Sequence, residues 1–135
     1  MVVLDDDAFA TLLRRAMVLM TRVDGHVDED EVVRIQWIMK RRFGRDLDAQ
    51  TVRSRVHEQI STGVRLHDLL AEHAATLGEQ QKSEVLKVAF AVASADGAIV
   101  DEEDVLLIRI AKSLSIGPAE YRTILRHAMV AREFL

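Results

Sequence analysis

Hydrophobic residues recur at helical spacing from the first residues of the chain onward. The first stripe follows the pattern i, i+3, i+4, i+7, i+8, i+11 and consists of Phe9, Leu12, Leu13, Ala16, Met17 and Met20. This period predicts an amphipathic helix that ends before the turn dipeptide Asp24–Gly25. We find no segment with the strict alternation that is typical of a β-strand. The pattern therefore predicts an all-α protein.

Glycine and proline residues divide the rest of the sequence into further helical segments. We expect them at about 29–43, 48–60, 65–75, 79–95, 101–114 and 118–132, with Gly117–Pro118 ending the sixth helix. The segment 79–95 is apolar nearly all round, which is typical of the central helix of a bundle. No linker or low-complexity tract interrupts the chain. We therefore expect about seven helices in a single domain that covers residues 1–135.

Composition narrows the class of protein. The chain has 135 residues, of which 49% are hydrophobic and 30% charged, the balance of an ordinary soluble domain. It contains no cysteine, which excludes disulfide scaffolds and thiolate chemistry, and its net charge of −4 argues against a nucleic-acid partner. Asp5–Asp7 stand where an export signal needs basic residues, and no apolar run is long enough for a transmembrane segment. These features predict a cytoplasmic protein.

The sequence contains an internal repeat with a shift of 72 residues. Val23–Val27 align with Ala95–Ile99, and the shift continues downstream, where Glu31, Val33, Ile38 and Lys40 align with Glu103, Val105, Ile110 and Lys112. Each copy consists of a helix, an Asp-Gly loop, an acidic cluster and a second helix. We therefore predict a duplicated helical hairpin, with copies at about 8–43 and 80–115 that pack about a pseudo-twofold axis.

The Asp-Gly loops have two interpretations. In the structural one, Gly25 and Gly97 end a helix in the left-handed conformation, and Asp28 caps the next helix in a capping box with Glu31. In the functional one, each loop gathers carboxylate ligands for Ca²⁺, Mg²⁺ or Mn²⁺. The candidate ligands are Asp24, Glu31, Asp96 and Glu103, with Asp28, Asp101 and Glu102 as auxiliary residues. The spacing is not that of an EF-hand.

Other residue clusters leave further alternatives open. His26 lies inside the first loop, either as an additional ligand or as an exposed side chain. Trp37 marks either a partner-facing patch or the rim of the core. The basic residues of the first half either meet an anionic membrane surface or an acidic partner, or are solvated helix ends. They are Lys40–Arg42, Arg45, Arg14, Arg15, Arg53 and Arg55. No catalytic motif is present, so we predict that the chain is not an enzyme.

The two loop motifs resemble those of the TerB-like family, the tellurite-resistance protein B group. The residues that carry this resemblance are Ala93–Ile99 followed by Glu103, and more faintly Arg22–Val27 followed by Glu31; 79–95 and Ile116–Tyr121 add to it. The best match is the stand-alone, small-protein branch. The resemblance implies about seven helices with internal duplication, and acidic residues gathered on one surface that binds a divalent metal. Val100 replaces an acid that is common in the motif, which weakens a second metal site.

These observations lead to two main hypotheses. The first is a non-enzymatic module of bacterial tellurite or chemical-stress resistance, in which Asp24, Glu31, Asp96 and Glu103 bind Ca²⁺, Mg²⁺, Mn²⁺ or Zn²⁺. We expect it to act with a protein partner, which for this family includes membrane-associated proteins. The alternative is a metal-independent adaptor, co-chaperone-like or associated with a membrane complex. A small hydrolase or sensor is a weaker third hypothesis, and the sequence does not determine the oligomeric state.

Overall fold

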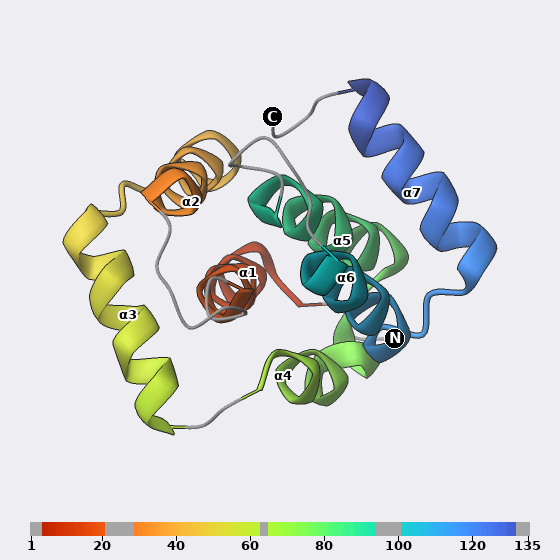
Figure 1. The fold of residues 1–135 in the computed structure, drawn as a ribbon, viewed down its shortest axis with the longest axis horizontal. Helices are drawn as coiled ribbons and strands as arrows, with labels where there is room; N and C mark the ends of the chain where they lie inside the picture. Colours follow the sequence, from red (N-terminus) through yellow and green to blue (C-terminus); the bar gives the residue numbers. More distant parts are fainter. Residues whose placement is uncertain (1–3, 21–28, 63–64, 94–100, 132–135) are drawn as a thin grey trace.

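Helices make up most of the part of the chain that the structure describes. A computed structural model describes residues 4–20, 29–62, 65–93 and 101–131. The helices in these ranges are α1 (Asp6–Met20), α2 (Glu29–Phe43), α3 (Ala49–Thr62), α4 (Leu66–His73), the short 3₁₀ helix η1 (Ala74–Thr76), α5 (Glu79–Ala93), α6 (Asp101–Ser113) and α7 (Pro118–Ala131) (Figure 1). No strand occurs among the described residues. The prediction of an all-α fold with seven α-helices is confirmed.

Helices α1 and α5 pack side by side at the centre of the molecule. Helix α1 contacts α2, α3, α4 and α5, and α5 contacts α1, α2, α6 and α7 (Figure 1). The apolar stripe predicted for α1 is buried along its whole length, from Phe9 to Met20. Val85, Leu86 and Phe90 are among the many buried residues of α5. The central place predicted for the 79–95 segment is therefore confirmed for the residues that the structure describes.

Two helices end in left-handed residues of different type. Gly44 follows α2 with φ +67°, and its N–H donates to the carbonyl of Lys40 over 2.9 Å. Ser115 follows α6 with φ +60°, and the N–H of Ile116 donates to the carbonyl of Ala111 over 2.8 Å, as in a Schellman motif. The predicted end of this helix at about residue 114 is confirmed to within one residue. Helix α6 ends at Ser113, and Ser115 makes the turn.

Helix α4 is shorter than predicted, and the 3₁₀ helix η1 that follows it is hydrogen-bonded to the segment before α1. The helix ends at His73 and continues as η1, although the pattern predicted a single helix to about residue 75. Thr76 accepts a hydrogen bond from the N–H of Leu4 at 3.0 Å, and the Leu4 carbonyl accepts one from Gln81 Nε2 at 2.8 Å. These bonds hold the segment before α1 against the start of α5.

The helix bounds follow the spacing of the sequence repeat. Helices α2 and α6 begin at Glu29 and Asp101, which are 72 residues apart. The aligned pair Ile38 and Ile110 is buried in both helices, and the aligned pair Val33 and Val105 is exposed in both. These similarities do not establish a duplication, which stays a prediction together with the copies at 8–43 and 80–115.

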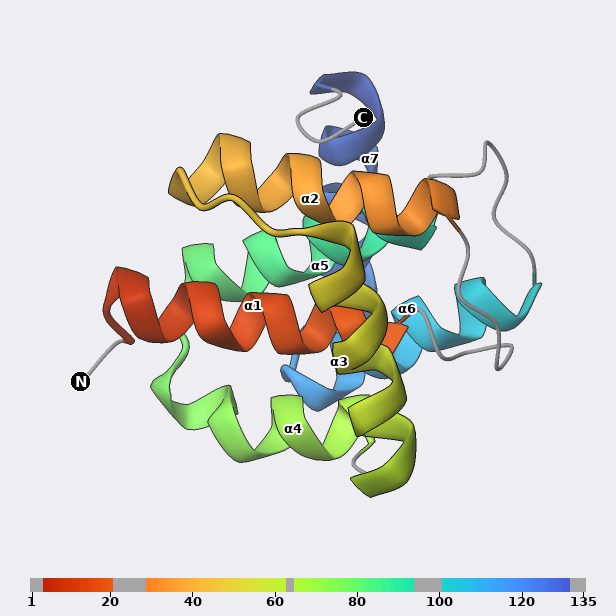
Figure 2. The same cartoon turned by 90° about the vertical axis from the view of Figure 1, so that its left-hand side faces the viewer.

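Four helix ends gather at one side of the molecule. Figure 2 shows that α1 and α5 end, and that α2 and α6 begin, at this side. We call it the acidic end, because the first turn of α2 contains Glu29, Asp30 and Glu31 and the first turn of α6 has the sequence Asp-Glu-Glu-Asp. None of the helices described is long and apolar enough to cross a membrane.

Candidate functional site

Most of the predicted metal ligands lie outside the described residues. This holds for Asp24, Asp28 and Asp96, and the side chains of Asp101, Glu102 and Glu103 at the start of α6 are likewise outside the described part. His26 is also outside it. Glu31 is half-buried in the first turn of α2, at the third helical position, which a capping box with Asp28 requires. Among the described side chains, no group of three His, Asp or Glu residues is arranged to hold a metal ion.

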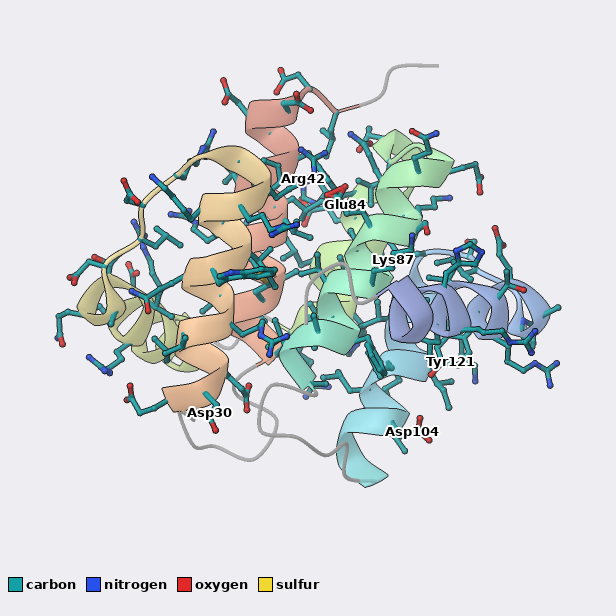
Figure 3. All side chains as sticks on the ribbon, turned by 90° about the horizontal axis from the view of Figure 1, so that it is seen from above. Asp30, Arg42, Glu84, Lys87, Asp104 and Tyr121 are labelled. Carbon is teal, nitrogen blue, oxygen red and sulfur yellow. The ribbon has the colours of Figure 1, made fainter. Side chains whose placement is uncertain are left out.

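The structure brings the two acidic helix starts to the same side of the molecule. Figure 3 shows Asp30 of α2 and Asp104 of α6 at this edge, each near the beginning of its helix. A helix N-terminus carries a partial positive charge that stabilises nearby carboxylates. The acidic end therefore concentrates negative charge from two segments that are far apart in the sequence.

Glu29 belongs to this end but serves to join two helices. Its Oε1 accepts a hydrogen bond from Arg53 Nε at 3.1 Å, and its Oε2 accepts one from Arg53 Nη2 at 2.7 Å. These bonds hold the pKa of Glu29 below its ordinary value and raise the pKa of Arg53. Because Arg53 lies on α3, Glu29 is committed to the α2–α3 contact, and this partner 24 residues away was not predicted.

Tyr121 of α7 lies near Asp104 of α6, next to the acidic end (Figure 3). Its hydroxyl oxygen is buried and has no hydrogen-bond partner among the described residues. Burial raises the pKa of Tyr121, and the charge of Asp104 adds to this effect. The phenol is therefore kept neutral over the physiological pH range.

Comparisons with known proteins identify the family. The family model described as "Tellurite resistance protein TerB" matches residues 8–126, from the first turn of α1 into α7. The chain belongs to the TerB family. Neither the comparison with curated proteins nor the comparison with solved structures found a match. TerB membership supports a role related to tellurite resistance and agrees with the all-α fold.

The outer face of α2 in this TerB-family chain exposes apolar side chains. Val33 is 60% exposed and Trp37 is 37% exposed. The guanidinium carbon of Arg41 lies 5.1 Å from the centre of the Trp37 ring, in a cation–π contact. Trp37 thus stands on the surface, and it forms with Val33 and Arg41 a stripe along one helix face, at i, i+4 and i+8.

Several basic residues of the first half are paired with carboxylates outside their own helix. Arg42 Nε donates to both oxygens of Glu84 on α5, at 3.1 and 2.9 Å (Figure 3). Arg45 Nη2 lies 2.7 Å from Asp7 Oδ1 at the start of α1, and Lys40 Nζ lies 3.0 Å from Asp46 Oδ1. Arg42 and Arg45 thus join elements that are distant in the sequence, whereas Lys40 pairs with a residue of the segment that follows its own helix.

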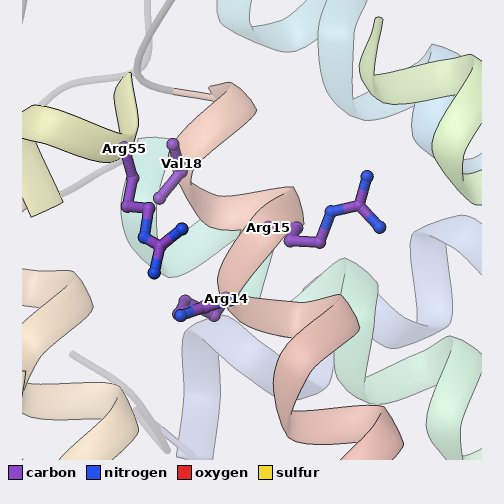
Figure 4. A pocket seen from close by; sticks show the side chains of 4 residues that line it. All are labelled: Arg14, Arg15, Val18 and Arg55. Carbon is purple, nitrogen blue, oxygen red and sulfur yellow. The ribbon is translucent and has the colours of Figure 1, made fainter. Parts of the chain in front are cut away.

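Two arginines of α1 differ from this pattern. Within the part of the chain that the structure describes, Arg14 and Arg15 form no ion pair with a carboxylate. Together with Val18 and Arg55 of α3 they line a pocket of about 80 Å³ (Figure 4). The sequence showed that these arginines belong to a basic group. It could not show the pocket, which forms where α1 packs against α3.

Proposed function

We propose that this TerB-family chain is a non-enzymatic module of bacterial tellurite or chemical-stress resistance, whose acidic end binds a divalent cation. Asp24, Glu31, Asp96 and Glu103 are the proposed ligands, with Asp28, Asp101 and Glu102 as auxiliary residues. The cation is Ca²⁺, Mg²⁺, Mn²⁺ or Zn²⁺. The module acts in the cytoplasm and changes its affinity for a protein partner when the cation binds.

The observation that carries this proposal is the position of the acidic helix starts. Helices α2 and α6 begin at the same side of the molecule, and Asp30 and Asp104 mark that side (Figure 3). Carboxylates brought together repel one another, and a divalent cation offsets this repulsion with oxygen ligands that it prefers. The family match supports the link to tellurite resistance.

A thermal-unfolding experiment tests the cation site. Chelator-treated protein is scanned alone and with each of the four cations. A ligand present at 100 times its dissociation constant stabilises the folded state by about 2.7 kcal/mol. We expect such a rise in Tm with at least one cation and its loss in the Asp24→Asn/Asp96→Asn double variant.

The control for this experiment is Asp46→Asn. It removes a carboxylate that is 84% exposed, lies beyond the other end of α2 and pairs with Lys40. This variant should keep the full cation response. The cation site is refuted if no cation raises Tm in the wild-type protein, or if both variants respond as the wild type does.

The exposed stripe on α2 favours a second candidate function, a metal-independent adaptor. Val33, Trp37 and Arg41 combine apolar area, an aromatic ring and a cation, the residue types that interface centres favour. On this hypothesis a protein partner, co-chaperone-like or part of a membrane complex, binds α2 directly. The acidic end then acts only as a pair of capped helix starts.

Chelation separates the two functions. Partners are captured with immobilised wild-type protein, the Asp24→Asn/Asp96→Asn variant and Trp37→Ala, each with and without chelator. The cation-dependent module predicts capture that is lost on chelation and in the double variant. The adaptor predicts capture that survives both and is lost in Trp37→Ala.

A further inference from the structure

We propose that the pocket between α1 and α3 is a binding site for a small oxyanion with two negative charges. Arg14 and Arg55 supply the cationic groups, and Val18 forms part of the pocket lining. This site is separate from the cation site of the acidic end, so that either proposal can fail without the other.

The geometry brings two guanidinium groups toward one space. Figure 4 shows the side chains of Arg14 and Arg55 extending toward one another beside Val18, whereas the Arg15 guanidinium extends to the other side of α1. Val18 is buried and lines the pocket beside the arginines, so it adds an apolar part to the wall. A guanidinium group offers parallel N–H donors that match the oxygens of a phosphate-like ion.

The charges around Arg14 are not balanced within the described residues. Partial burial lowers the pKa of Arg14, and the charges of Arg55, Arg45 and Arg15 lower it further. An arginine nevertheless stays protonated at neutral pH. Arg45 is held by Asp7 at 2.7 Å, but Arg14 has no carboxylate at hydrogen-bond distance among the described residues. A partly buried cation that faces the guanidinium group of Arg55 is unfavourable, and a bound anion offsets this repulsion.

Glu58 is the carboxylate that competes with such an anion. It lies 3.5 Å from Arg55 Nη1, three residues along α3, and its charge acts on Arg14 in the opposite direction to the arginines. At that distance it is a weak, exposed pair. Glu58 therefore competes only weakly with an anion in the pocket for the Arg55 guanidinium.

The size of the pocket limits the class of ligand. A volume of about 80 Å³ exceeds the roughly 10–15 Å³ that a cavity needs to hold one water, and it is far below the roughly 300–1,000 Å³ of pockets for drug-sized molecules. An inorganic ion such as phosphate or tellurite fits these limits. Because the chain contains no cysteine, the ion is held here by charge and hydrogen bonds, with no thiol to react with it.

A titration with inorganic phosphate tests the site. The Nε–Hε signals of the arginines are followed by NMR at constant ionic strength, in the full chain and in single variants. In Arg14→Gln and Arg55→Gln we expect the dissociation constant for phosphate to rise at least about tenfold, since each variant removes a charged hydrogen bond. Arg126→Gln removes the same charge from an exposed position on α7 and should leave the constant unchanged within about twofold.

Glu58→Gln gives a test that does not depend on losing a function. It removes the competing carboxylate, so phosphate should bind more tightly than to the wild type. Tellurite should displace phosphate from the same signals. The proposal is overturned if Arg14→Gln binds phosphate as well as Arg126→Gln does, if Glu58→Gln does not tighten binding, or if sodium chloride produces the same shifts. Tighter binding of phenyl phosphate than of phosphate would also overturn it, because the ligand would then be a phosphorylated partner.

Discussion

Replacement of Gly44 by alanine tests the turn that ends α2. Gly44 has φ +67°, a conformation that L-residues with a Cβ atom rarely adopt. A Cβ atom built on Gly44 meets no other atom within 4 Å, so the substitution introduces no steric clash with the rest of the fold. The loss of stability in Gly44→Ala therefore comes from the backbone conformation alone.

The magnitude follows from two opposing contributions. Placing a non-glycine residue in the left-handed region costs about 1–2 kcal/mol. Alanine also reduces the conformational freedom of the unfolded chain, which offsets about 0.4–1 kcal/mol. We expect a net destabilisation of about 1 kcal/mol. With an unfolding entropy of about 2.1 cal/mol/K per residue, this lowers the Tm of a 135-residue domain by about 3–4 °C.

Gly117→Ala is the matched control for this experiment. Gly117 also has open space around a built Cβ atom, but its φ is not in the left-handed region. Its carbonyl accepts from the N–H of Tyr121 at the start of α7, where alanine is a poorer N-cap but restricts the unfolded chain, so the net change should be near zero. Urea unfolding followed by circular dichroism measures both variants. Equal stability of Gly44→Ala and Gly117→Ala would refute the reasoning.

Three further predictions concern Ser115, Tyr121 and Glu29. Ser115→Gly should raise the free energy of unfolding by about 0.5–1 kcal/mol in the same urea assay, because glycine adopts φ +60° without the penalty of a Cβ atom, whereas Ser115→Ala should give no gain. Tyr121→Phe should be at least as stable as the wild type at pH 7, by up to about 1 kcal/mol, because the buried hydroxyl has no partner among the described residues. Since the folded-state pKa of Tyr121 is raised from 10.0, the unfolded chain ionises first, so the wild-type free energy of unfolding is unaffected by this group below pH 10 and falls relative to that of Tyr121→Phe as the pH rises further; a stability gap to Tyr121→Phe that stays constant to pH 11 would contradict this. Since the folded-state pKa of Glu29 is lowered from 4.5, the contribution of its carboxylate to the free energy of unfolding is present above pH 4.5 and is lost as the pH falls below it. The acid unfolding curves of the wild type and Glu29→Gln should therefore converge at low pH.

The sequence predicted those features that depend on neighbours within one or two helical turns. The bounds of α2 and the starts of α5, α6 and α7 agree with the expected positions, because apolar periodicity and helix-breaking residues act locally. The central place of α5 followed from its apolar surface on all sides. The end of α6 agrees to within one residue, but the left-handed conformation of Ser115 was not predicted, because glycine is far more common in that conformation.

Features that join distant parts of the chain could not be predicted in the same way. Arg42 and Glu84 are 42 residues apart, and Arg14 and Arg55 meet only because α1 packs on α3. A charge run in the sequence does not reveal which carboxylate lies opposite each cation after folding. The placement of Asp24 and Asp96 relative to each other is likewise a question of tertiary structure, and both lie outside the described residues.

The energetics of these charges decide how informative their variants are. Exposed ion pairs contribute only about 0–1 kcal/mol each, and pairs such as Lys40–Asp46 and Arg45–Asp7 have at least one strongly exposed partner. The fold is stabilised chiefly by the buried apolar side chains around α1 and α5. Charged residues at the acidic end and in the arginine pocket can therefore be neutralised one or two at a time with the helical core intact. A loss of cation or anion binding in such variants then reports on the site itself, and circular dichroism of each variant provides the check.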